Sequence, residues 1–422
     1  MDMNLDLIET DVAMFDPDAF GIDAQEAKLN TLARRLGREC FAPRAADYDR
    51  EARFPTENYR DLRLVGLLGL CVPCTDGGIG AGYRAYCTTA AEIGRYCAAT
   101  ALTWNMHTAT CLWTGALADD LEMATDERQA HERRRALHYR RILEDGALFA
   151  QPFSEGGGYD GATGVAPFST TATRVPGGWK INGRKIFASL SGAADYYGIL
   201  CGEPREGEAP SRKNTMYIAV PAGAPGVEVT GDWDPLGMRA TVSRTILFKD
   251  VFVDEDAALM PPGLYFQAAQ RWPHMFLTLT PTYVGLAQAA FDFTVRYLRG
   301  EIADTGGDKR RSPAKRQAVA EMFVMLQQLK TLWFQVVSEA RVDPAREQVQ
   351  RGLAMQYTVM EQANAIAQLA LRTCGGRALF RSLPLERIAR DSRCGSVMLP
   401  WTAEICLERL GRETLYQPGE PD

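Results

Sequence analysis

One stretch of the chain, residues 146–195, differs in texture from everything around it. Its segment ALFAQPF is a strand candidate, and STTATRV alternates apolar and polar side chains with a period of two, which is typical of strands. Between them, SEGGGYDGATG carries too many glycines for regular structure and predicts a loop. Pro176-Gly177-Gly178 predicts a turn, and Asn182-Gly183 predicts a second turn of the hairpin type. The stretch therefore predicts a small antiparallel β unit whose loops expose backbone and hydroxyl groups.

Helical periodicity dominates both sides of this β unit. From Ala24 to about Gly146, apolar residues recur every three or four positions. From Tyr265 onward, long segments that are apolar on one side follow one another with short polar links, which favours an antiparallel helical bundle. We therefore predict three domains, namely a helical domain at 1–147, a β domain at 148–256 and a helical bundle at 257–422.

Bulk properties narrow the function classes. The chain has 422 residues, of which 46% are hydrophobic and 24% charged, as in ordinary globular proteins, and its net charge of -6 argues against a nucleic-acid surface. The N-terminus lacks the basic region and apolar core of a signal peptide, and no run reaches the roughly 18 apolar residues of a membrane helix. We expect a cytoplasmic protein with neither nucleic acid nor membrane as partner. The ten scattered cysteines suit reduced thiols, and the CxxC of Cys71 and Cys74 lacks a second pair, so no metal is predicted.

Several motifs resemble those of the acyl-CoA dehydrogenase superfamily of flavoproteins. Ser154-Glu155-Gly156 stands where that family has Thr-Glu-Pro, and the segment from Lys185 to Ser189 resembles its Lys-x-Trp-Ile-Thr. Further matches follow in the family's order at 235–239, 248–253, 374–376 and 385–393. The resemblance runs from about Lys28 to Leu415. It implies an α+β fold with an N-terminal helical domain, a central antiparallel β-barrel or sandwich and a C-terminal four-helix bundle.

The resemblance also implies FAD as the cofactor. Carried over position by position, Ser154 matches the threonine at the pyrimidine edge of the flavin, Ser189 matches the threonine near N5, and Phe187 matches the tryptophan packed against the ring. Phe153 belongs to the same expected site. A second group of residues is expected at the adenine-diphosphate half of a neighbouring subunit's FAD, with Arg310 and Arg311 as further candidates to neutralise the pyrophosphate. These residues are Gly375, Gly376, Thr402, Glu404 and Arg296.

The glutamate that removes the α proton in the family's dehydrogenases is missing. Pro400 stands at its usual position, and its alternative position on the first bundle helix falls on His274-Met275-Phe276. Because the pKa of histidine suits base work near neutrality, His274 and His107 are the candidate bases. His107 shares a helix face with Trp104 and Cys111, which the resemblance places at the acyl pocket. Plainer interpretations stay open, namely a packed core histidine for His107 and a helix entry for His274.

Several functions follow from the resemblance. The first is α,β-dehydrogenation of an acyl thioester, carried on CoA or a carrier protein, with an electron acceptor such as an electron-transfer flavoprotein. Two other flavin reactions need no α-proton base: monooxygenation, and an elimination such as desulfination of an acyl-CoA. A fourth possibility is a non-enzymatic homologue that keeps only the bundle. The resemblance further implies a homotetramer or homodimer.

Overall fold

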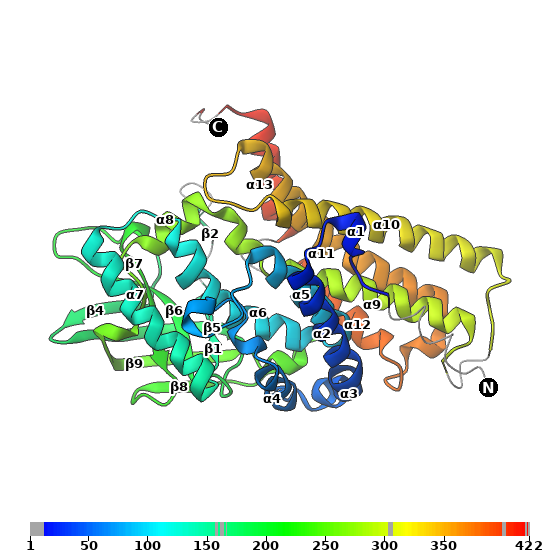
Figure 1. Cartoon of the computed structure of the whole chain (residues 1–422), viewed down its shortest axis with the longest axis horizontal. Coiled ribbons are helices and arrows are strands. Elements are labelled where there is room, and N and C mark those ends of the chain that lie inside the picture. Colours follow the sequence, from blue (N-terminus) through cyan, green and yellow to red (C-terminus); the bar gives the residue numbers. More distant parts are fainter. Residues whose placement is uncertain are drawn as a thin grey trace.

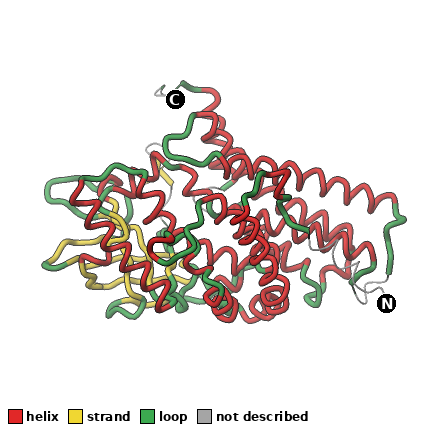
Figure 2. The backbone as a smooth tube through the Cα atoms, viewed as in Figure 1, coloured by secondary structure: helices red, strands yellow, loops and turns green. Residues whose placement is uncertain are grey.

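A computed structural model describes the protein over residues 12–156, 159–160, 164–165, 167–302, 307–398, 402–417 and 420. Helices fill most of the molecule, and the strands gather at one end of it (Figures 1 and 2). Three parts follow one another along the chain: a layer of helices, a sheet, and a bundle of long helices. The predicted fold class is confirmed. None of the helices within the described ranges is long and apolar enough to cross a membrane.

The first part consists of helices that lie in the middle of the molecule and over the sheet (Figure 1). Its first long helix begins with a capping box, because the Asp23 carboxylate accepts from the Glu26 N–H at 2.9 Å while the Glu26 carboxylate accepts from the Asp23 N–H at 3.2 Å. The helices are α1 (Pro17–Phe20), α2 (Ala24–Leu36), η1 (Gly37–Phe41), α3 (Ala42–Glu51), α4 (Thr56–Leu64), η2 (Leu67–Gly69), η3 (Cys74–Asp76), α5 (Tyr83–Tyr96), α6 (Ala98–Leu112), η4 (Trp113–Leu117), α7 (Thr125–Arg140) and η5 (Arg141–Asp145).

The second part is a sheet of eight strands with the order β10-β7-β6-β4-β5-β9-β8, and β1 lies beside β6. Most neighbours run antiparallel, but β1 and β4 each run parallel to β6, so the sheet is mixed. A separate pair joins β2 and β3. The strands are β1 (Phe149–Ala150), β2 (Tyr159–Asp160), β3 (Gly164–Val165), β4 (Thr171–Val175), β5 (Gly178–Ala188), β6 (Tyr196–Gly202), β7 (Thr215–Pro221), β8 (Val227–Thr230), β9 (Arg244–Asp254) and β10 (Ala258–Met260).

The turn predicted at Asn182-Gly183 is wrong. The hairpin between β4 and β5 turns at Pro176-Gly177, and β5 then runs unbroken through Gly183. The register of β5 against β9 shifts at this point, which marks a bulge. A Cβ atom on Gly183 would lie 2.6 Å from the Cα atom of Thr170, so this glycine permits a close approach of two backbones rather than a turn.

The third part is a bundle built around α9, against which α5, α11 and α12 pack. The contact between α5 and α9 is close enough to require glycine, because a Cβ atom on Gly285 would lie 2.4 Å from the Ala91 carbonyl oxygen. The helices are α8 (Leu264–Arg271), η9 (Pro273–Leu277), α9 (Thr280–Arg299), α10 (Pro313–Ser338), α11 (Arg346–Cys374), η10 (Gly376–Leu379), α12 (Leu385–Gly395) and α13 (Ala403–Leu415).

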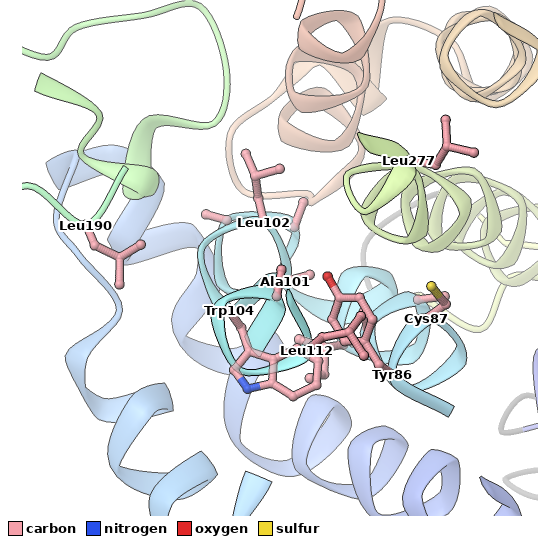
Figure 3. Packing of buried hydrophobic residues seen from close by; sticks show 14 of the residues in the cluster. Tyr86, Cys87, Ala101, Leu102, Trp104, Leu112, Leu190 and Leu277 are labelled. Carbon is pink, nitrogen blue, oxygen red and sulfur yellow. The ribbon is translucent and has the colours of Figure 1, made fainter. Parts of the chain in front are cut away.

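One continuous apolar core joins the three parts. Figure 3 shows Trp104 and Leu102 of α6 in this cluster, together with Leu190, which follows β5, and Leu277 of the bundle. The bend after β5 is therefore anchored in the same core that holds the helices together.

Candidate functional site

Two adjacent bends at the end of the sheet hold residues in a strained backbone conformation. Phe187 and Leu190 have φ values of 51° and 64°, and Met238 and Val242 have φ values of 54° and 46°. They are four of the seven non-glycine residues with positive φ in the described part of the chain. The bends are joined by the N–H of Leu190, which donates to the Thr241 carbonyl at 3.0 Å. Such strain persists where the surroundings enforce it, and it gathers at functional sites.

Phe187 is the aromatic side chain presented by the first bend. It is 65% exposed, and its ring lies 6.4 Å from the Trp233 ring in an edge-to-face arrangement. An exposed aromatic ring on a strained backbone has a packing partner on one side only. Its open face suits a flat aromatic group such as a flavin ring.

Hydroxyl groups line the space beside Phe187. Ser189 Oγ lies 2.9 Å from Ser243 Oγ, and Ser243 Oγ lies 2.7 Å from Thr241 Oγ1. Thr241 donates in turn to the Met238 carbonyl at 2.8 Å. Of these residues the sequence predicted only Ser189. The other hydroxyl residues lie about fifty positions later and meet Ser189 only through the pairing of β5 with β9.

The Ser154 segment is fastened beside the same bend. The N–H of Ile186 donates to the Ser154 carbonyl at 2.8 Å, which brings the segment after β1 against the end of β5. The Glu155 carboxylate pairs with the fully buried Lys185 ammonium at 2.6 Å and accepts a hydrogen bond from the Thr170 N–H at 3.0 Å. Burial raises the pKa of the Glu155 carboxyl, but Lys185 and the donors around it more than reverse this effect, and the pKa ends below its usual value. Glu155 is thus an anchoring anion.

Phe153 belongs to an aromatic cluster that the sequence did not predict. Its ring stacks on Trp113 at 5.4 Å and meets Tyr217 and Tyr265 edge to face at 5.7 and 5.9 Å. The indole N–H of Trp113 is buried and has no hydrogen-bond partner among the described residues. The cluster joins η4, the segment after β1, β7 and α8. It forms an apolar wall directly beside Ser154.

A cleft of about 740 Å³ opens against the two bends. This volume lies within the range of cofactor and ligand pockets. Its wall includes Ala52, Leu148, Ser191, Gly192, Val242 and Arg244, but none of Ser154, Phe187 and Ser189, so it is not the space in front of the expected flavin contacts.

His107 is held on both sides of its ring. Its Nδ1 accepts from the Phe149 N–H at 3.1 Å, and its Nε2 lies 3.0 Å from the Leu68 carbonyl. Burial lowers the pKa of His107 to about 4. Both ring nitrogens are committed to backbone groups, which favours the packed-core interpretation.

His274 lies on η9 and is 1% exposed. Neither ring nitrogen has a hydrogen-bond partner among the described residues, and the ring meets Trp272 edge to face at 5.9 Å. Burial lowers the pKa of His274 to about 4, although Glu339 at the end of α10 opposes this shift. The side chain is therefore a neutral imidazole with free donor and acceptor atoms.

The predicted adenine-diphosphate residues lie in the bundle. Gly375 and Gly376 join α11 to η10, and a Cβ atom on either would meet nothing within 4 Å. Thr402 caps α13 and Glu404 is exposed in its first turn. Arg296, in the last turn of α9, lies 3.8 Å from the Glu301 carboxylate. Pro400, the position of the missing base, lies outside the described residues.

Comparison with known proteins places this chain in a family. The family models of the acyl-CoA dehydrogenase N-terminal, middle and C-terminal domains match residues 23–120, 154–251 and 270–414, respectively. The chain therefore belongs to the acyl-CoA dehydrogenase family and is an acyl-CoA dehydrogenase-like flavoenzyme, an oxidoreductase.

Relatives and solved structures span nearly the whole chain. L-evernosamine nitrososynthase of a Micromonospora species is 29% identical over 88% of this chain and 86% of its own length. The putative acyl-CoA dehydrogenase YdbM of Bacillus subtilis is 26% identical over 84% of this chain and 88% of its own. The structure of KijD3 in complex with FMN and a dTDP-linked amino-keto sugar superposes with a TM-score of 0.78 at 22% identity, covering 97% of each chain.

Proposed function

We propose that this chain is a flavin-dependent monooxygenase. The observation that carries the proposal is that neither candidate base is placed to act. Both ring nitrogens of His107 are taken by the Phe149 N–H and the Leu68 carbonyl, and His274 is 1% exposed on η9. A general base must lie within hydrogen-bond reach of the proton that it removes, and these two buried imidazoles do not offer that access.

Glu155 is no better as a base. Its carboxylate is neutralised by Lys185 at 2.6 Å and accepts from the N–H groups of Ser169 and Thr170 at 2.6 and 3.0 Å. Its lowered pKa makes protonation unfavourable near neutrality. The residues around the expected flavin site are thus suited to hold a ring and to exclude water, whereas His107, His274 and Glu155 are poorly suited to remove a proton.

Monooxygenation needs no α-proton base. Reduced flavin supplies two electrons to dioxygen, so that one oxygen atom enters the substrate and the other leaves as water. The chain's own part is to hold the ring against Phe187, to meet its polar edge with Ser154 and Ser189, and to shield it with the aromatic cluster of Trp113, Phe153, Tyr217 and Tyr265. The nitrososynthase relative and the amino sugar bound by KijD3 support an amine as the substrate class.

The charges in the bundle support FMN over the FAD that the resemblance implies. A bound pyrophosphate needs cationic partners. Among the candidates, Arg296 faces Glu301, and Arg310 makes two hydrogen bonds to Asp308 at 3.0 and 2.8 Å. Of these three candidates, Arg311 is exposed and makes no ion pair with another described residue. Glu404 would add a negative charge where FAD carries its own.

The first experiment compares the two reactions on the same purified protein. Loaded with oxidised FMN or FAD and mixed anaerobically with a panel of acyl-CoA thioesters, the protein should not bleach its flavin band. Supplied with reduced FMN, isotopically labelled dioxygen and a panel of primary amines and amino sugars, it should form a product that carries one labelled oxygen atom. Bleaching by a thioester without labelled product would sink the monooxygenase proposal.

Dehydrogenation of an acyl thioester is the second candidate. The free nitrogens of His274 and the relatives that are acyl-CoA dehydrogenases favour it. In that case the His274→Phe variant should lose thioester bleaching while it still binds flavin, whereas a monooxygenase should retain labelled product.

A further inference from the structure

The hydroxyl chain beside Phe187 has only one favourable direction. A carbonyl oxygen can only accept and each hydroxyl has one hydrogen to donate. Thr241 must therefore donate to the Met238 carbonyl at 2.8 Å, which obliges Ser243 to donate to Thr241 and Ser189 to donate to Ser243. The Ser189 hydrogen is thereby turned inward, and the Ser189 oxygen offers only lone pairs to a group in front of it.

The inner end of this chain is rigid and dry. Reversing its direction would place a lone pair of Thr241 against the Met238 carbonyl at 2.8 Å. Thr241 and Ser243 are 1% and 6% exposed, so water does not replace either partner. Met238 is itself fixed, because its N–H donates to the buried Asp391 carboxylate at 2.6 Å. Hydrogen bonds in such a chain polarise one another in the same direction.

We propose that the polarised chain of Ser189, Ser243 and Thr241 makes this site bind reduced flavin in preference to oxidised flavin. The inference rests on the proposed function and on the match of Ser189 to the hydroxyl near flavin N5. N5 of oxidised flavin is an acceptor and would face the lone pairs of Ser189. N5 of two-electron-reduced flavin carries a hydrogen that Ser189 can accept. The preference suits an enzyme in which reduced flavin must meet dioxygen inside the site.

The expected effect is measurable as a ratio of affinities. A buried polar atom that lacks its partner weakens binding by about one order of magnitude. Reduced FMN should therefore bind about tenfold more tightly than oxidised FMN. By linkage, the midpoint potential of bound FMN should lie about 30 mV above that of free FMN.

Two variants break the chain at its inner links. In Thr241→Val, Ser243 loses its acceptor and can turn its hydrogen toward Ser189, which frees Ser189 to donate to oxidised flavin. Ser243→Ala frees Ser189 directly. Thr215→Val is the matched control, because Thr215 is also buried and donates to a carbonyl three residues earlier, that of Arg212, at 2.6 Å, with no second hydroxyl attached.

The test measures dissociation constants for oxidised and dithionite-reduced FMN, and the midpoint potential of bound FMN, in all four proteins. The inference is supported if the dissociation constant of oxidised FMN is about ten times that of reduced FMN in wild type and Thr215→Val, and if this ratio falls toward one in Thr241→Val and Ser243→Ala. A ratio near one in wild type, or an unchanged ratio in both folded chain variants, overturns it while flavin binding stands. Should Thr241→Val fail to fold, Ser243→Ala decides alone. Failure of wild type to bind either form of FMN or FAD overturns the proposed function and the inference with it.

Discussion

At the scale of single residues, His107 acts as a bridge between two backbone segments. Its Nδ1 accepts from the Phe149 N–H, so Nε2 carries the hydrogen that reaches the Leu68 carbonyl. We predict that His107→Ala lowers the free energy of unfolding by about 3 kcal/mol, because it strands a buried donor and a buried acceptor. Denaturant titration should detect this loss, while flavin bound per folded molecule stays constant. If the His107→Ala variant instead keeps wild-type stability and loses reactivity with thioesters, His107 is a catalytic base.

Asp391 makes stability depend on pH. Burial raises the pKa of its carboxyl from 3.8 to about 6, although the Met238 N–H opposes the shift. The folded protein then holds a proton that the unfolded chain releases, so this contribution is complete below about pH 4 and disappears as the pH rises through 6. It amounts to at most about 3 kcal/mol.

Asp391→Asn keeps an oxygen for the Met238 N–H and removes the titration. We predict that wild type loses stability relative to this variant as the pH rises from about 4 to about 7. Unfolding midpoints measured across that range check the prediction, and parallel curves for the two proteins would contradict it.

Sequence motifs predicted only the outer residues of the candidate site, and those residues remain predictions. Ser154, Phe187 and Ser189 could be matched because they lie in short segments with a recognisable order. Thr241 and Ser243 carry no pattern of their own, and their relation to Ser189 depends on strand register and on the strained φ of Met238 and Val242. The occupied nitrogens of His107 are equally invisible in a sequence, since their partners are backbone groups.

At the scale of elements, α12 fastens the sheet to the bundle. Arg390 pairs with Asp49 of α3 at 2.6 Å and with Glu386 at 2.8 Å, and it donates to the Leu236 carbonyl at 2.9 Å. The loop that holds Met238 and Thr241 therefore rests on a helix from the far end of the chain.

We predict that Arg390→Ala destabilises the protein by about 2–4 kcal/mol, since it leaves two partly buried carboxylates unpaired. Amide hydrogen exchange should rise in residues 236–243 in particular. Arg310→Ala is the control, because its exposed pair with Asp308 should leave both exchange and stability unchanged. Equal exchange in wild type and Arg390→Ala would show that α12 does not hold the loop.

Elements differ in how well the sequence predicted them. Long amphipathic segments gave the helices of the bundle, because their periodicity extends over many turns. The turn predicted from Asn182-Gly183 does not form, because these residues lie inside a long strand in which Gly183 contacts Thr170. This contact outweighs the local turn preference of the dipeptide. Local preference is decisive only where tertiary contacts do not compete with it.

At the scale of the whole molecule, one apolar core runs through all three parts. Outside this core, apolar side chains are exposed on the surface beside Gly375-Gly376. Leu379 and Phe380 follow Gly375-Gly376 and are exposed. Such side chains at a surface are typical of interfaces, and the resemblance implies that this loop meets a neighbouring subunit's cofactor. We therefore expect a homodimer or homotetramer in which these residues lie at a subunit contact.

The double substitution of Leu379 and Phe380 by Glu should dissociate that assembly, which size-exclusion chromatography with light scattering can measure. Leu64→Glu, at a residue 82% exposed on α4, is the control and should leave the assembly intact. The affinities of the dissociated protein also distinguish FMN binding from FAD binding. FMN has no adenine half to reach a neighbour's glycines, so its affinity should be unchanged, whereas FAD should bind at least about tenfold more weakly if it spans the contact. A loss of FMN affinity on dissociation would show that the flavin ring itself depends on the partner subunit.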